Sequence, residues 1–224
     1  AEDIEGEQSQ IDHIKGQAYA LRALAHFDLV KFYGQQHVNG GGLSAPGVPY
    51  VTTFRDNDAL FPSRSTVQEV RDMAYEDLEM AASLMNTSVT NGYINIYAVR
   101  AIEARIANYF GDWSRALEAA EFVVEEGPFE IVNESNFVSS FATDASPNTI
   151  FELIASETDN NGINGIANMY QPTSYGDIVA LPNLAAIYDE GDVRGASPYV
   201  LDEEGEYPDP TTIIGILEDG VIRN

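Results

Sequence analysis

The chain has 224 residues and carries 36 Asp and Glu against 11 Lys and Arg, which gives a formal net charge of −25. Apolar residues make up 44% of it, enough for a folded core, while the absence of Cys excludes disulfides and cysteine-ligated metals. Nucleic acid is excluded as a partner, because binding a phosphate backbone needs clustered Lys and Arg.

Residues 11–34 are predicted to form a long amphipathic helix. Its apolar side chains recur at steps of three and four residues and draw one stripe: Ile14, Ala18, Leu21, Ala25, Leu29 and Phe32. Within this helix, His26 is predicted to be packed. Residues 34–65 are then rich in Gly, Pro, Asn and Ser, which predicts a long loop. Loops of this length usually bind something or move, so this loop is the first candidate for ligand binding.

Three further helices are predicted, each starting at a residue that can cap its first turn: 66–87 at Thr66, 95–110 at Asn95, and 114–127 at Ser114. Only Gly-Asp-Trp separates the last two, so they should form an antiparallel hairpin. On the last helix, the residues predicted to face back onto the preceding helix are Ala116, Leu117, Ala120 and Val124. Trp113, the single Trp, is predicted to wedge between the two helices.

The pattern changes after residue 128. In residues 129–133 and 149–156, apolar and polar residues alternate and β-branched residues are frequent, which predicts two short strands. Residues 158–177 are rich in Asn and Gly and are predicted to form a second long loop. We therefore expect a helical scaffold over 1–128 and a loop-rich part with a few short strands over 129–224, within one continuous domain.

Six sequence blocks, in this order, resemble the SusD/RagB family of Bacteroidetes surface lipoproteins. They are LRALAHFDLVKFYG (21–34), GVPYV (47–51), RSTVQEVRDMAYEDLEMAASLM (64–85), AIEARIANYFGDWSRALEAAEFVVEEGPFEI (101–131), NTIFEL (148–153) and YDEGDVR (188–194). Each block is degenerate alone, since helix pairs with small residues occur in all tetratricopeptide proteins. Their shared order makes the resemblance specific.

The resemblance implies a mainly α fold of tetratricopeptide-like antiparallel hairpins with long loops, here incomplete and truncated at the C-terminus. Family members are held on the extracellular face of the outer membrane by a lipidated N-terminal Cys, and the printed sequence contains no Cys. They pass oligosaccharides or polysaccharides to a SusC-like TonB-dependent transporter. The resemblance therefore implies a non-catalytic, surface-exposed glycan-binding protein for nutrient uptake.

Two other functions stay open at this point. One is a tetratricopeptide-type scaffold that binds a peptide or a protein, and the other is a helical glycoside hydrolase. Hydrolysis needs two carboxyl groups roughly 5–10 Å apart, which 36 acidic residues supply by chance. No nucleophile elbow, zinc-protease helix or P-loop occurs in the sequence, so we predict that the chain is not an enzyme.

The predicted ligand contacts lie in the two long loops. Tyr170 and Tyr175 would offer aromatic faces to a sugar, and hydrogen bonds would come from Gln36, His37, Asn39 and Asn168. This holds only if the loops converge, and they could equally point to opposite faces. Tyr50 in the first loop is a further candidate for stacking.

The charged residues are predicted to be structural. Arg22, Arg100 and Arg105 lie within helices and should pair with carboxylates such as Asp77 and Glu103. A calcium ion could be held by the acidic loop of Asp202, Glu204, Glu206 and Asp209, but the loop lacks the register of an EF-hand, and a solvated loop is favoured. We expect no cofactor and no metal.

Overall fold

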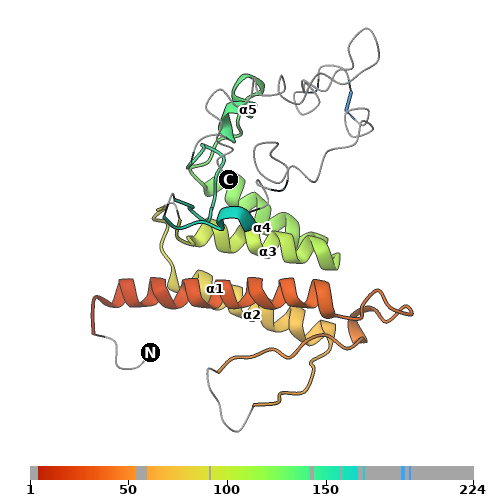
Figure 1. Cartoon of the computed structure of the whole chain (residues 1–224). Coiled ribbons are helices and arrows are strands. Elements are labelled where there is room, and N and C mark those ends of the chain that lie inside the picture. The colour runs from red at the N-terminus through yellow and green to blue at the C-terminus, as the bar shows by residue number, and fades with distance from the viewer. Residues whose placement is uncertain are drawn as a thin grey trace, which may run out of the picture. The chain divides into compact units, whose positions relative to one another are not determined.

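A computed structural model describes residues 5–53, 60–90, 92–141, 144–156, 158–165, 169, 188–189 and 192 (Figure 1). It divides the chain into two compact units, Ala1–Phe129 with Ile150–Glu152, and Glu130–Thr149 with Leu153–Asn224. The described part is mainly helical, as predicted. Whether the chain is one continuous domain stays a prediction.

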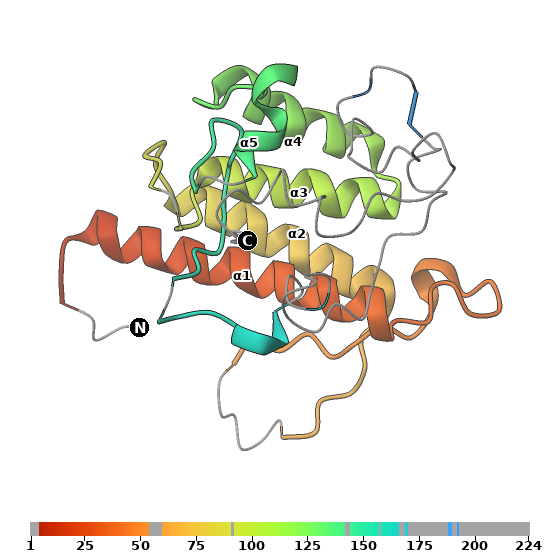
Figure 2. The same ribbon diagram turned by 45° about the horizontal axis from the view of Figure 1, so that its top comes forward.

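Four long helices build the first unit: α1 (Gln8–Tyr33), α2 (Val67–Leu84), α3 (Ile96–Phe110) and α4 (Trp113–Glu126). They pack in chain order, α1 on α2, α2 on α3 and α3 on α4 (Figure 2). All four helices were predicted from the sequence to within three residues at each end. No helix in the described part is long and apolar enough to cross a membrane.

The helix ends show why these segments are helical. Thr66 accepts a hydrogen bond from the Glu69 backbone N–H, and Glu69 accepts one from the Thr66 N–H, so the predicted capping box is present. Asn95 caps α3 by accepting from the Ala98 N–H at 2.9 Å. The predicted cap at Ser114 is wrong, because α4 already starts at Trp113, with the Asp112 carbonyl accepting the Ala116 N–H at 2.9 Å.

Helices α3 and α4 form the predicted hairpin. Gly111 ends α3 with φ +80°, a left-handed conformation that a side chain would strain, and so reverses the chain in two residues. The prediction that Trp113 wedges between the helices is wrong, since its side chain is 67% exposed. The pair buries small side chains such as Ala107 and Ala119, so the helices approach closely and the indole stays outside.

The core of the first unit is drawn mainly from α1, α2 and α3, and α4 adds the partly buried Ala116. It includes Phe27, Val30, Val67, Val70, Leu78, Val99, Ile102 and Ile106. Small residues bring α1 and α2 together. A Cβ atom on Gly16 would lie 3.0 Å from the side chain of Met85 and 3.1 Å from the Ala81 carbonyl oxygen. A larger residue at position 16 would therefore require Met85 and the α2 backbone at Ala81 to move by a few tenths of an ångström.

Two of the apolar stripes predicted from periodicity are exposed rather than buried. On α1, the exposed residues are Ile14, Ala18, Leu21, Ala25, Leu29 and Phe32. On α4, the exposed residues are Leu117, Ala120 and Val124, whereas Ala116 is half-buried and packs against the core as predicted. The buried face of α1 instead carries Ala20, Ala23, Phe27 and Val30, which are also apolar. Because α1 is apolar on two faces, its periodicity could not identify the one that packs.

The strands predicted at 129–133 and 149–156 are absent from the structure. Both segments are extended but form no ladder, and a strand needs repeated hydrogen bonds to a neighbour. Glu130 N–H donates to the Pro147 carbonyl at 3.0 Å, and the Ile150 carbonyl accepts from the side-chain amide of Asn95 at 3.1 Å. These single bonds tie the extended segments down without building a sheet.

The described part of the second unit holds the short helix α5 (Phe137–Ser140) and two 3-10 turns, Glu134–Asn136 and Gly162–Asn164. The rings of Phe137 and Phe141 meet edge to face at 5.2 Å. The strands expected further along the chain lie outside the described residues.

Candidate functional site

The long loop between α1 and α2 is fixed to both helices by one buried carboxylate. Asp77 on α2 is 6% exposed and accepts hydrogen bonds from Arg22 on α1, from Nε at 2.6 Å and from Nη2 at 2.5 Å. The hydroxyl of Tyr50, in the loop, donates to the same carboxylate at 2.7 Å. The predicted pairing of Arg22 is thereby confirmed, and Asp77 joins two helices and the loop.

His26 completes this attachment, and the prediction that it is packed is confirmed. Its Nε2 accepts the Val51 backbone N–H at 3.0 Å, so Nδ1 carries the proton and donates to the Arg22 carbonyl at 2.8 Å. Its ring stacks on Tyr50 with centroids 4.0 Å apart. Burial, and then the hydrogen bond to Asp77, raise the pKa of Tyr50 above its usual range. Tyr50 is therefore engaged on one ring face and at its hydroxyl, which argues against a role as a free sugar platform.

The other end of the loop is fixed by Arg64. Its Nε donates to the Gly47 carbonyl at 2.7 Å and its Nη2 to the Tyr33 carbonyl at the end of α1 at 2.8 Å. Between these fixed ends the loop exposes large apolar side chains, with Phe61 at 95% and Leu60 at 63%. Phe61 was not among the predicted ligand contacts, although an aromatic residue in a Gly- and Pro-rich loop was a usable signal.

The structure brings Gln36 and His37 together through a residue of α3. The Tyr109 hydroxyl accepts from Gln36 Nε2 at 2.8 Å and lies 3.2 Å from His37 Nε2. Gln36 Nε2 also donates to the Val30 carbonyl at 3.2 Å, near the end of α1. Gln36 Oε1 is buried and has no hydrogen-bond partner among the described residues, so an ordered hydroxyl or water there would be favoured. No local signal in the sequence pointed to Tyr109, which lies 73 residues from Gln36.

The other predicted contacts are not joined to this group in the described structure. Asn39 is exposed in a left-handed turn at φ +51°, and its side chain makes no hydrogen bond to another described residue. Asn168, Tyr170 and Tyr175 lie outside the described residues, so their convergence with the first loop stays a prediction. The acidic loop at 202–209 lies outside them too. Elsewhere in the described ranges, no three His, Asp or Glu side chains gather as metal ligands.

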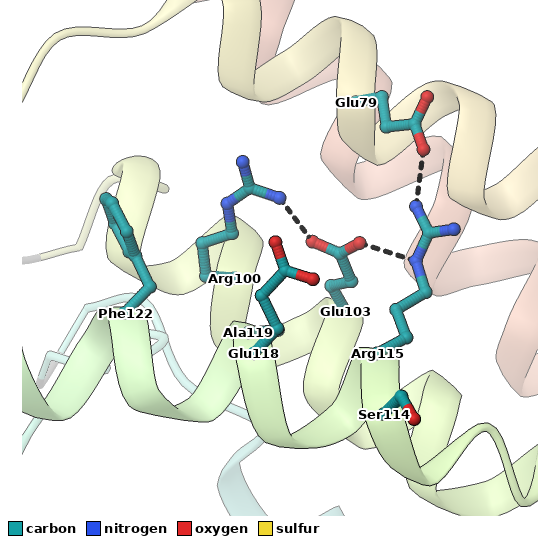
Figure 3. Close-up of a pocket in the computed structure, with 8 residues that line it drawn as sticks. All are labelled: Glu79, Arg100, Glu103, Ser114, Arg115, Glu118, Ala119 and Phe122. Carbon is teal, nitrogen blue, oxygen red and sulfur yellow. Dashed lines mark hydrogen bonds and ion pairs between the residues drawn. The ribbon is translucent and has the colours of Figure 1, made fainter.

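A charged hollow of about 580 Å³ lies over α2, α3 and α4. Figure 3 shows Glu103 between two guanidinium groups, accepting from Arg100 Nη1 and from Arg115 Nε, each at 2.6 Å. Arg115 also reaches Glu79 at 2.5 Å. The predicted pairing of Arg100 is thus confirmed, whereas Arg105 pairs with no described carboxylate. Both oxygens of the buried Glu103 are therefore engaged in ion pairs.

The fold and sequence of this chain are similar to those of known proteins. A family model described as "Starch-binding associating with outer membrane" matches residues 2–108. A SusD-like protein of Formosa agariphila is 28% identical over 184 residues, which cover 75% of this chain and 34% of that protein. A SusD superfamily structure from Bacteroides thetaiotaomicron has a TM-score of 0.73 at 24% identity, over 90% of this chain and 46% of that one. A laminarin-binding SusD-like protein has a TM-score of 0.53 at 18% identity, over 65% of this chain and 31% of that one. The chain spans less than half the length of each of these three proteins.

Proposed function

We propose that the chain is part of a non-catalytic protein of the SusD/RagB family that captures oligosaccharides or polysaccharides at the outer membrane. The observation that carries this proposal is the match of residues 2–108 to the family described as starch-binding and associated with the outer membrane. A similar fold in a laminarin-binding protein supports the same ligand class.

The geometry of the first loop supports a binding role. A ligand site gains affinity when its residues are held in place before the ligand arrives, because less conformational entropy is lost on binding. The Asp77 network and Arg64 hold the loop in this way, while Phe61 and the exposed imidazole of His37 remain accessible. Aromatic faces and hydrogen-bonding side chains are the groups that recognise a sugar ring and its hydroxyls.

The finer parts of the proposal follow from the family. We propose that the protein faces the outside of the cell through a lipid anchor and hands its glycan to a SusC-like TonB-dependent transporter. We also propose that it acts without a cofactor or a metal ion. A tetratricopeptide-type peptide scaffold is the alternative, and the family match favours the glycan.

Binding is tested by affinity electrophoresis through gels that contain soluble starch or laminarin. We expect the protein to be retarded in at least one of them. His37→Ala and Gln36→Ala should reduce the retardation, and the neighbouring exposed Gln35→Ala serves as the matched control. Tyr170→Ala or Tyr175→Ala should weaken binding by about fivefold, because one aromatic contact contributes about 1 kcal/mol.

Two results would contradict the proposal. Retardation by neither polysaccharide, with capture of peptides instead, would favour the scaffold. Release of reducing ends from either polysaccharide, abolished by changing one carboxylate, would show that the protein is an enzyme.

A further inference from the structure

Trp113 borders a second hollow, which the proposed site does not use. This hollow measures about 570 Å³ and lies between the start of α4 and the facing side of α2. Its charged and aromatic lining consists of Arg71, Asp72, Tyr75, Asp112, Trp113 and Arg115. Trp113 is the only Trp of the chain and is 67% exposed, whereas Tyr75 is 7% exposed. The exposed aromatic face at this hollow therefore belongs to Trp113.

The charged groups of this hollow are held in place by one another. The Tyr75 hydroxyl donates to Asp112 at 2.7 Å, and Arg71 pairs with Asp72 at 2.8 Å and lies 3.6 Å from Asp112. The Arg115 guanidinium lies 4.0 Å above the centre of the Tyr75 ring. The lining is thus a connected network rather than a set of free surface side chains.

Charge indicates what kind of ligand fits. Two Arg and two Asp line the hollow, so its formal charge is zero in a chain whose net charge is −25. A phosphate or a charged peptide would have to compete with ion pairs that are already formed. A neutral polyhydroxyl ligand would not, since paired guanidinium and carboxylate groups still offer donors and acceptors.

We propose that Trp113 is the stacking platform of a second binding surface for neutral glycans, separate from the first loop. The indole packs on the apolar face of a sugar ring, and the Arg71–Asp112 side of the hollow takes up its hydroxyls. This inference rests on the proposed function, because it assigns a second site for the same ligand class. Neutral glucans such as laminarin and starch fragments are the ligands that it predicts.

The ligand is an oligosaccharide rather than a single sugar. Ser114 and Arg115 line this hollow and also the charged hollow over α3, so the two adjoin. An oligosaccharide stacked on Trp113 would extend past Ser114 and Arg115 into the charged hollow, so longer oligosaccharides should bind more tightly than short ones.

A protein helix is the competing occupant, because Trp113 is followed along α4 by Leu117, 59% exposed, and Val124, 78% exposed. The two occupants would use α4 differently. A helix would cover Trp113 and Leu117 together, whereas a sugar in the hollow would touch Trp113 and not Leu117, which does not line it. Leu117→Ala is therefore the matched control for Trp113→Ala.

The single Trp makes the test specific. Maltoheptaose and laminarin oligosaccharides are titrated into the protein while tryptophan fluorescence is recorded, and we expect a saturable shift of the emission to shorter wavelength. In calorimetric titrations, Trp113→Ala should weaken binding by about two- to tenfold. Trp113→Phe should weaken it less, and Leu117→Ala should leave it unchanged. Equal melting temperatures of the variants would show that the fold is intact.

Three results would overturn the inference. If the oligosaccharides bind without changing the fluorescence, and Trp113→Ala binds as the wild type does, the second surface is wrong while the proposed function stands. If neither oligosaccharide binds the wild type, the proposed function fails for neutral glucans as well. If Trp113→Ala and Leu117→Ala weaken binding equally, the face recognises apolar area along α4, as a protein partner would.

Discussion

Replacing Asp77 by Ala should loosen the first loop and destabilise the helical unit. The substitution removes the acceptor of both Arg22 hydrogen bonds and of the Tyr50 hydroxyl. It leaves a guanidinium group and a phenol without their partner at a site where the carboxylate was 6% exposed. Stability and loop order should therefore fall together.

The expected magnitude follows from burial. Removing one partner of a fully buried ion pair costs about 3–5 kcal/mol. The Arg22 side chain is 26% exposed, so water can solvate part of the released charge, and we expect about 2–3 kcal/mol. For a protein of this size, that lowers the melting temperature by roughly 4–12 °C. Asp77→Asn should cost less, since its amide oxygen can still accept a hydrogen bond.

The measurements are chemical denaturation followed by circular dichroism, and hydrogen exchange of the peptide around residues 47–52. The Val51 N–H, held by His26, should exchange faster in Asp77→Ala. Glu79→Ala is the control, because Glu79 lies on the same helix as Asp77 and also pairs with an Arg, Arg115 of α4. Its side chain is 62% exposed, so its loss should cost less than about 1 kcal/mol. If both variants lost the same stability, or if Val51 kept its protection, Asp77 would not be what holds the loop.

Three further predictions follow from burial, capping and ionisation. Phe27→Ala should lower the free energy of unfolding by about 3–5 kcal/mol, whereas Leu21→Ala, on the exposed face of α1, should lower it by less than about 1 kcal/mol. If denaturation curves showed a larger loss for Leu21→Ala, the buried face of α1 would be misassigned. Thr66→Ala should cost about 1 kcal/mol by breaking the capping box, and a helix content and stability equal to the wild type would contradict this. Burial and carboxylate neighbours raise the pKa of Tyr50 and of Tyr75, so the folded state keeps protons that the unfolded chain releases near pH 10. The stability that these two Tyr residues contribute should therefore be fully present below about pH 10 and fall above it. Replacing both by Phe should make the melting temperature fall less steeply between pH 9 and pH 12.

The candidate site could be predicted only in part from the sequence. Composition identified the loop at 34–65, and within it Gln36 and His37, because a Gly-, Pro- and Asn-rich segment of that length is recognisable locally. Their meeting with Tyr109 was not predictable, because it depends on where α3 packs against the end of α1. Asp77 was predicted to pair with one of the helical Arg residues, but not to hold Tyr50, a residue from the loop.

The sequence by itself determined the four helices, the caps at Thr66 and Asn95, and the hairpin. These features depend on neighbours within about one turn: Thr66 with Glu69, Asn95 with Ala98, and Gly111 between two helical patterns. The six ordered blocks likewise indicated the resemblance to SusD-like proteins, and a family model matches residues 2–108. Only the tertiary structure decided which face of a helix is buried. Helix α1 carries apolar residues on two sides, and the side with Gly16, Ala20 and Ala23 packs because small residues let α2 approach closely. The tertiary structure also decided that Trp113 stays outside the α3–α4 pair. Helical periodicity predicts which residues share a face of a helix, but it does not predict which neighbouring element that face contacts.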